Sequence, residues 1–201
     1  MNISIFRQLK FYESILYLTR SVLRKFNITI NFKECYMFFL PKETYKGVST
    51  SNCIRLTLQD FEKQIQINPQ WFTQKKIADL KHAFSMEGNI PYGLYKDDLL
   101  IAYGWISIQY IGLSERRLKK GDCYLWDDYT HPLYRGKGLH KTIIKIRLHE
   151  ASKIGCNRVF SIVSLFNKSS SIGFKNVGFQ RFQFFLTYKI FQFNEHSTFK
   201  Y

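Results

Sequence analysis

Residues 124–140 read YLWDDYTHPLYRGKGLH, and they run from a strand-like segment through a proline into a turn that opens a helical pattern. The first backbone N–H groups of a helix have no internal partner and carry partial positive charge. Gly136 and Gly138 let the backbone approach an anion closely, and Arg135 and Lys137 add positive charge. The residues alone therefore predict either a phosphate-binding turn or a glycine turn with a purely conformational role.

The segments around this turn alternate between helical and strand-like patterns. Apolar residues recur at helical spacing over 139–153, and Gly155 follows as a left-handed cap. Upstream, two strand-like runs flank the acidic turn 96–98, and this short connection predicts antiparallel pairing. The other elements expected here are strands over 92–95, 99–106, 123–130 and 159–163, a helix over 168–176, and a final strand or hairpin over 180–193.

The first 50 residues are predicted to form an extension ahead of a domain that spans residues 51–201. The extension begins with a basic amphipathic helix over 3–26. This helix either packs its apolar stripe on the domain or on a second subunit, or lies on an anionic bilayer. The residues of the stripe are Ile5, Leu9, Tyr12, Leu16 and Leu23.

The region between this helix and residue 91 predicts a strand, a polar connector, a second strand and a long helical stretch. The aromatic-rich run 36–40 ends at Pro41, as a strand closed by a turn does. The connector covers 42–52, strand 53–56 follows, and Thr57 or Gln59-Asp60 opens the helix. The helical stretch includes Ile77, Leu80 and Phe84 and stops at Gly88 and Asn89.

Charge and cysteine content limit the classes of function. Thirty Lys and Arg against fifteen Asp and Glu leave a net charge of +15, which predicts attraction to a polyanion. Nucleic acid is disfavoured as that partner, because the cations are spread without a basic block or an RNA-binding signature. The four cysteines lack any C-x-x-C pair, so no metal site is expected. Because no signal peptide or spanning segment is evident, a cytoplasmic location is expected, with peripheral contact at the inner membrane face if the helix binds lipid.

The stretch 124–139 resembles the central motif of GNAT acyltransferases, in which a strand and a proline precede R-x-x-G-x-G/A at the start of a helix. Arg135 and Gly138 match this motif, whereas His140 stands where the family usually has Gly or Ala. Downstream, Asn167-Lys168-Ser169-Ser170 and Gly178-Phe179 look like the family's N-x-x-S/A and G-F signatures. With Gly104-Trp105 ending an upstream strand, the resemblance covers roughly residues 53–190.

The resemblance implies an α+β GNAT fold: a splayed, mixed and mostly antiparallel sheet flanked by helices, here with an extra N-terminal helix and strand. It implies acetyl-CoA as the acyl donor, with its pantetheine arm in the split of the sheet. Tyr129 to His131 and Leu133 would supply backbone contacts, and Asn167 and Ser170 would flank the pantetheine and thiol. The residues expected to bind the cofactor are Thr130, His131, Leu133, Arg135, Gly136, Lys137, Gly138, Leu139, His140, Asn167, Ser170 and Phe174.

Acyl transfer to an amine needs a base, because the amine is protonated at neutral pH. Asp127 and Asp128 end the central strand, and adjacent strand residues face opposite sides, so one carboxylate is expected to reach the acceptor. Asp127 is favoured, a bulge would decide the choice, and both carboxylates have an ion-pair interpretation as well. Phe174 stands where many relatives have the tyrosine that protonates the departing thiolate. Tyr129 or His140 replaces that acid, or the thiolate leaves unassisted.

The sequence as a whole therefore predicts an N-acetyltransferase that acts on a small amine, and the subgroup resemblance suggests an amino sugar of surface-polysaccharide assembly. A protein or peptide amine and an aminoglycoside-like compound are alternative acceptors. A non-catalytic acyl-CoA-binding module is the alternative from another class. A homodimer is a further expectation, and the aromatic residues Trp71, Phe72, Tyr92, Trp105 and Trp126 are candidates for the acceptor pocket.

Overall fold

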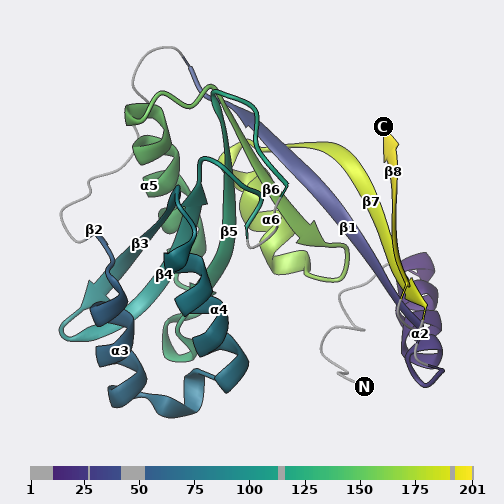
Figure 1. Cartoon of the computed structure of the whole chain (residues 1–201), viewed down its shortest axis with the longest axis horizontal. Helices are drawn as coiled ribbons and strands as arrows, with labels where there is room; N and C mark the ends of the chain where they lie inside the picture. The colour runs from purple at the N-terminus through teal and green to yellow at the C-terminus, as the bar shows by residue number, and fades with distance from the viewer. Residues whose placement is uncertain (1–10, 27, 42–52, 113–115, 191–192, 201) are drawn as a thin grey trace. The chain divides into compact units, whose positions relative to one another are not determined.

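The computed structural model describes residues 11–26, 28–41, 53–112, 116–190 and 193–200 (Figure 1). The chain packs as two compact units. Unit 1 combines the residues up to Met37 with those from Ser161 on, and unit 2 is Phe38–Phe160. The predicted connector 42–52 and the first part of the predicted helix 3–26 lie outside the described residues.

Unit 2 contains the central strands and three helices (Figure 1). Its elements are β2 (Cys53–Arg55), α3 (Leu58–Ile67), the 3₁₀ turn η1 (Pro69–Trp71), α4 (Gln74–Ser85), β3 (Asn89–Lys96), β4 (Leu99–Ser107), β5 (Asp122–Thr130), the 3₁₀ turn η2 (Pro132–Tyr134), α5 (Leu139–Lys153) and the start of β6 (Arg158–Ser164). The elements of unit 1 are α2 (Phe11–Arg24), β1 (Ile28–Phe39), the end of β6, α6 (Lys168–Val177), β7 (Gln180–Ile190) and β8 (Phe193–Lys200).

The strands hydrogen-bond in the order β2-β3-β4-β5-β6-β1-β7-β8, which confirms the predicted α+β fold with a mixed and mostly antiparallel sheet. The parallel pair is β5 with β6, and its register covers Asp122–Tyr124 against Arg158–Phe160. From residue 125 on, β5 is paired along β4 alone among the described registers. Where the predicted site begins, one edge of this strand therefore has no pairing partner among the described residues.

Most predicted elements form with small shifts of their ends, and two predictions were wrong. The single helical stretch from Thr57 to Phe84 is divided into α3 and α4. Thr57 and Asp60 form a capping box at the start of α3, but Pro69 lacks a backbone N–H and begins η1, and Thr73 then caps α4. The strand predicted over 36–40 begins eight residues earlier as β1, because its polar half is held by antiparallel pairing with β7.

The core of unit 2 lies where α3 and α4 cover one face of β4. Tyr103 and Trp105 both pack against Phe61 of α3, with ring centroids 5.0 and 6.1 Å away. Because side chains alternate along a strand, Gly104 between them faces the other side, where Arg147 of α5 lies. The two faces of β4 at this point therefore belong to α3/α4 and to α5, and this arrangement sets the environment of the site.

Candidate functional site

A β-bulge interrupts β5 at the two predicted carboxylates. The register pairs Trp105 with Trp126 and Tyr103 with Tyr129, so Gly104 stands opposite both Asp127 and Asp128. Asp127 takes a left-handed backbone conformation, with φ of 54°, as the first residue of such bulges often does. The bulge determines separately which helix each carboxylate meets.

Asp128 turns toward α5 and is held by a buried arginine. Arg147 is fully buried and donates from Nη2 to Asp128 Oδ1. Its Nη1 donates to the carbonyl oxygens of Trp105, at 3.0 Å, and Trp126, at 3.4 Å. His140 Nε2 lies 3.3 Å from the other carboxylate oxygen of Asp128. The guanidinium thus ties together the two strands on either side of the bulge.

Gly104 has no side chain because this arrangement leaves no room for one. A Cβ built there would lie 2.6 Å from Arg147 Cζ and Nη1 and 2.6 Å from Asp128 Oδ1. Contacts that short require a shift of the partners, which are held by hydrogen bonds at the bulge. The glycine that ends the upstream strand motif is therefore explained by packing against a buried ion pair.

Asp127 turns to the opposite face, toward α4. Its carboxylate pairs with Lys76 Nζ, and the side chain of each partner is about a quarter exposed. The same ammonium lies 5.4 Å from the centroid of the Tyr103 ring. Burial raises the pKa of Asp127 above the ordinary aspartate value, while the charge and hydrogen bond of Lys76 oppose that rise. Asp127 is thus a carboxylate of raised pKa with a primary ammonium on it.

Two polar side chains that follow Asp127 in the chain are buried without a hydrogen-bond partner among the described residues. The Tyr129 hydroxyl is one, and its ring stacks on Tyr103 with centroids 5.1 Å apart. Burial raises the pKa of Tyr129, so its hydroxyl keeps its proton at neutral pH. The second is His131 Nε2. His131 Nδ1 accepts the Leu133 N–H at 3.2 Å, and burial lowers the pKa of the ring, so Nε2 carries its hydrogen.

The glycine turn presents an open, positively charged surface. Gly136 and Gly138 have φ of 78° and 76°, and an added Cβ would meet nothing within 4 Å at either position. Gly138 is the N-cap of α5 and supplies no side-chain cap. Arg135 and Lys137 are exposed, and Lys137 lies 4.8 Å from the Tyr134 ring centroid. Backbone donors at a helix start with flexible cations beside them fit the pyrophosphate of acetyl-CoA.

The remaining predicted cofactor contacts occupy distinct local positions. Thr130 ends β5, His131 caps η2, and Leu133 is 75% exposed. Leu139 and His140 form the first turn of α5. Asn167, Ser170 and Phe174 belong to unit 1.

Within unit 1, Asn167 caps α6. Its side chain accepts the Ser170 N–H at 3.2 Å. Phe174 is fully buried, stacked on Tyr36 at 6.3 Å and edge-on to Phe179 at 5.0 Å. The phenyl ring therefore contributes to the core of this unit, and its contact with the cofactor stays a prediction.

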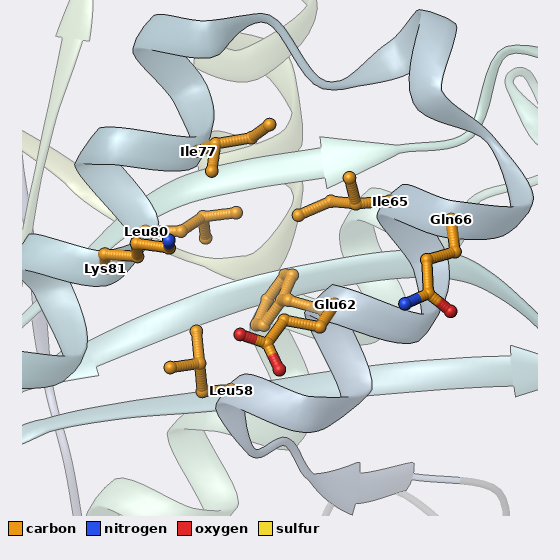
Figure 2. Close-up of a pocket in the computed structure, with 8 residues that line it drawn as sticks. Leu58, Glu62, Ile65, Gln66, Ile77, Leu80 and Lys81 are labelled. Carbon is orange, nitrogen blue, oxygen red and sulfur yellow. The ribbon is translucent and has the colours of Figure 1, made fainter.

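Two cavities lie away from these residues. One, of about 320 Å³, opens between α3 and α4 and is lined by Leu58, Phe61, Glu62, Ile65, Gln66, Ile77, Leu80 and Lys81 (Figure 2). The other, of about 360 Å³, is lined by Cys53, Arg55, Tyr92, Ile146 and Glu150. No predicted catalytic or cofactor-binding residue lines either cavity.

The candidates for the acceptor pocket differ in exposure. Phe72, Tyr92 and Trp105 are buried. Trp71 and Trp126 are half-buried, and the Trp71 ring lies edge-on to His131 with centroids 3.7 Å apart. Among the described residues, no group of three His, Cys, Asp or Glu is arranged to hold a metal ion. Within the same part of the chain, no helix is long and apolar enough to cross a bilayer.

Sequence reasoning missed Lys76 and Arg147. Arg147 had a signal, because it stands four residues after Ile143 and four before Ala151, in the middle of the apolar face of α5. A charged residue on a core face needs a buried partner, and Asp128 is that partner. Lys76 carried no such signal, since it is one of three cations in α4 and only the fold brings it to Asp127.

Comparison with known proteins yields a family match and several similar folds. The model of the acetyltransferase (GNAT) family matches residues 54–179. A Novosphingobium aromaticivorans protein described as a GNAT-family acetyltransferase is similar in structure, with a TM-score of 0.55, 14% identity, and coverage of 78% of this chain and 62% of that one. This chain thus spans less than two thirds of that protein's length. No curated protein matches the sequence.

Two further solved structures show the same likeness. The aminoglycoside antibiotic 6'-N-acetyltransferase of Acinetobacter haemolyticus has a TM-score of 0.53, 17% identity, and coverage of 72% of this chain and 97% of that chain. A Staphylococcus epidermidis protein of unknown function has a TM-score of 0.55, 10% identity, and coverage of 84% and 64%. At such identities the likeness concerns the fold.

Proposed function

Since this chain belongs to the acetyltransferase (GNAT) family, we propose that it transfers the acetyl group of acetyl-CoA to the primary amine of a small acceptor. The amine attacks the thioester directly, while donor and acceptor are bound together. The observation that carries this proposal is the seating of a primary ammonium, Lys76 Nζ, on the carboxylate of Asp127. Because this carboxylate already binds the ammonium of Lys76, its charge and shape suit the ammonium of an acceptor as well.

Asp127 is the proposed base. Asp128 is ill suited, because Arg147 and His140 occupy its oxygens and its charge is needed beside a buried guanidinium. Asp127 has the raised pKa of a carboxylate placed for proton transfer. When the acceptor ammonium displaces Lys76, its proton passes to Asp127, and the free amine attacks the acetyl carbonyl. Nitrogen then bonds to the acetyl carbon as the carbon–sulfur bond breaks, and the nitrogen loses its second proton to solvent, which restores the proton given to the departing thiolate.

Tyr129 is the proposed proton donor to the departing thiolate. Its hydroxyl is protonated and buried, and it has no other partner among the described residues. A thiol with pKa near 8.5 needs only modest assistance as a leaving group. His140 is the second candidate that the sequence left open, but its contact with Asp128 gives its ring a structural role.

Acetyl-CoA is proposed to bind along the end of β5 and the glycine turn. Gly136, Lys137, Gly138, Leu139 and His140, with Arg135, would hold the pyrophosphate through backbone N–H groups and charge. Thr130, His131 and Leu133 would contact the pantetheine arm, where β5 beyond Tyr124 pairs with β4 alone among the described registers. Contacts of Asn167, Ser170 and Phe174 with the cofactor are also proposed, on the family resemblance.

An amino sugar is the proposed acceptor class. Aromatic faces pack well on sugar rings, and the half-buried Trp71 and Trp126 are placed in the unit that carries Asp127. The net charge of +15 disfavours polycationic acceptors such as aminoglycosides and favours neutral or phosphate-linked amino sugars. We also propose a role in surface-polysaccharide assembly, a cytoplasmic location, a homodimer and a domain boundary at residue 50.

A non-catalytic acyl-CoA-binding module is the second candidate. It is favoured by Phe174, which places a buried phenyl ring where many relatives have an acidic hydroxyl. A protein or peptide N-acetyltransferase is a third candidate, which differs only in the acceptor.

The proposal is tested by thiol release from acetyl-CoA in the presence of free amino sugars, nucleotide-linked amino sugars and peptides. We expect stoichiometric thiol and acetylated acceptor, identified by mass spectrometry, with at least one amino sugar. Binding of acetyl-CoA without thiol release above background across all three groups would favour the non-catalytic module. Release with peptides alone would move the acceptor to the protein class.

Replacing Arg135 with Glu is expected to raise the Kd for CoA by about tenfold to a hundredfold, because a charge-assisted contact to phosphate becomes a repulsion. Isothermal titration calorimetry measures this change. Lys81→Glu is the matched control, since it makes the same charge change at an exposed residue of α4. If the Arg135 variant and the control bound CoA with equal affinity, the pyrophosphate would not bind at this turn.

A further inference from the structure

The polar side of helix α2 packs against the rest of unit 1. Glu13 is buried and accepts a hydrogen bond from Lys168 Nζ. Arg20 Nη2 donates to Asn31 Oδ1 at 2.9 Å, and its guanidinium lies 5.6 Å from the Phe166 ring centroid. Tyr17 meets the same ring edge-on at 5.3 Å. The inner face of this amphipathic helix is therefore mostly polar, the reverse of the usual arrangement.

The outer face of α2 is apolar. Its residues recur at i, i+4, i+7, i+11 and i+15, so they form one stripe along the helix and the turn after it. Every member is between 40% and 83% exposed. This outer stripe consists of Phe11, Ile15, Leu18, Val22 and Phe26. The stripe predicted from the sequence is different: Ile5 and Leu9 lie outside the described residues, and Tyr12, Leu16 and Leu23 lie on the flank of the outer stripe.

A continuous stripe of this kind is unusual on a soluble surface and marks a contact site. Among the described side chains of unit 1, the exposed charges are positive. The two acidic side chains described there, Glu13 and Glu34, are both buried in ion pairs. Arg24 and Lys25 are exposed at the end of the helix, with Arg24 on its polar side. An apolar face on a helix that carries exposed cations complements a surface with an apolar interior and anionic headgroups.

We propose that the outer stripe of α2 inserts into the interface of an anionic lipid bilayer. The helix lies in the plane of the membrane, with the stripe among the acyl chains and with Arg24 and Lys25 at the headgroups. A second copy of the chain fits less well. Two chains of +15 repel each other, and five apolar residues are far fewer than the 20–30 or so residues that each partner of a stable dimer contributes. This inference does not depend on the proposed catalytic function.

Vesicle co-sedimentation of the full chain tests the inference. We expect binding to phosphatidylcholine vesicles that contain phosphatidylglycerol, weaker binding at high salt, and little binding to phosphatidylcholine alone. Ile15→Glu is expected to lower the partition coefficient by at least about tenfold, because it removes a buried apolar side chain from the lipid. Ile67→Glu is the matched control, since Ile15 and Ile67 are both 48% exposed and Ile67 lies on α3.

Circular dichroism checks that both variants are folded. Because both substitutions are at surface positions, the spectrum should be unchanged. Absence of binding to the anionic vesicles would overturn the inference, as would equal loss of binding in Ile15→Glu and Ile67→Glu. Sedimentation velocity tests whether a second copy of the chain occupies the stripe instead. A concentration-dependent dimer that Ile15→Glu abolishes, without lipid binding, would assign the stripe to a second copy instead.

Discussion

Asp127→Asn is expected to lower kcat by about 10²–10⁴-fold and to leave the Kd for acetyl-CoA unchanged, because a general base is lost and the glycine turn is untouched. Asn keeps the shape and hydrogen-bonding capacity of the side chain but cannot accept the ammonium proton. Steady-state kinetics with the acceptor identified by the thiol-release screen, together with calorimetry for CoA, separate the two quantities.

The pH profile gives this prediction a second readout. Only the ionised carboxylate accepts a proton, so kcat should rise with pH through the pKa of Asp127, which burial places above the ordinary value of about 3.9. That limb should vanish in Asp127→Asn. Asp98→Asn is the control, because Asp98 makes an exposed ion pair with Lys63 in the same unit. A loss of kcat below tenfold in Asp127→Asn, or an equal loss in the control, would exclude Asp127 as the base.

Arg147→Met is expected to lower the free energy of unfolding by about 3–5 kcal/mol, since it leaves Asp128 nearly buried without its cation. It also removes the donors to the Trp105 and Trp126 carbonyls that flank the bulge. Urea unfolding followed by tryptophan fluorescence measures the change. This loss of unfolding free energy should exceed the loss caused by breaking any surface ion pair in the described part of the chain.

Two variants show whether the buried charge is the cause. Lys153→Met breaks a partly exposed ion pair with Glu150 on the same helix and should change stability by less than about 1 kcal/mol. Arg147→Met combined with Asp128→Asn should recover part of the loss, because the uncompensated carboxylate is gone. An Arg147→Met variant as stable as Lys153→Met would show that the guanidinium does not hold the bulge.

Much of the fold could be predicted from the sequence because the signals are local. The capping residues Thr57 and Asp60 start α3, the acidic turn at Asp97 closes the β3–β4 hairpin, and Gly138 opens α5. Each of these depends on backbone conformations within a few residues. The helix break at Pro69 was missed although its signal is local, because the apolar spacing on both sides continued through it.

The sequence by itself therefore determined the order of strands and helices, the glycine turn and the short list of carboxylates. Only the tertiary structure decided which carboxylate meets which helix, because a one-residue bulge opposite Gly104 turns Asp127 to Lys76 and Asp128 to Arg147. It also decided that α2 exposes its apolar side, since Asn31 of the next strand and Lys168, 155 residues beyond its partner Glu13, hold the polar side inward. Such partners meet through pairing and packing over long sequence separations, and no local pattern encodes them.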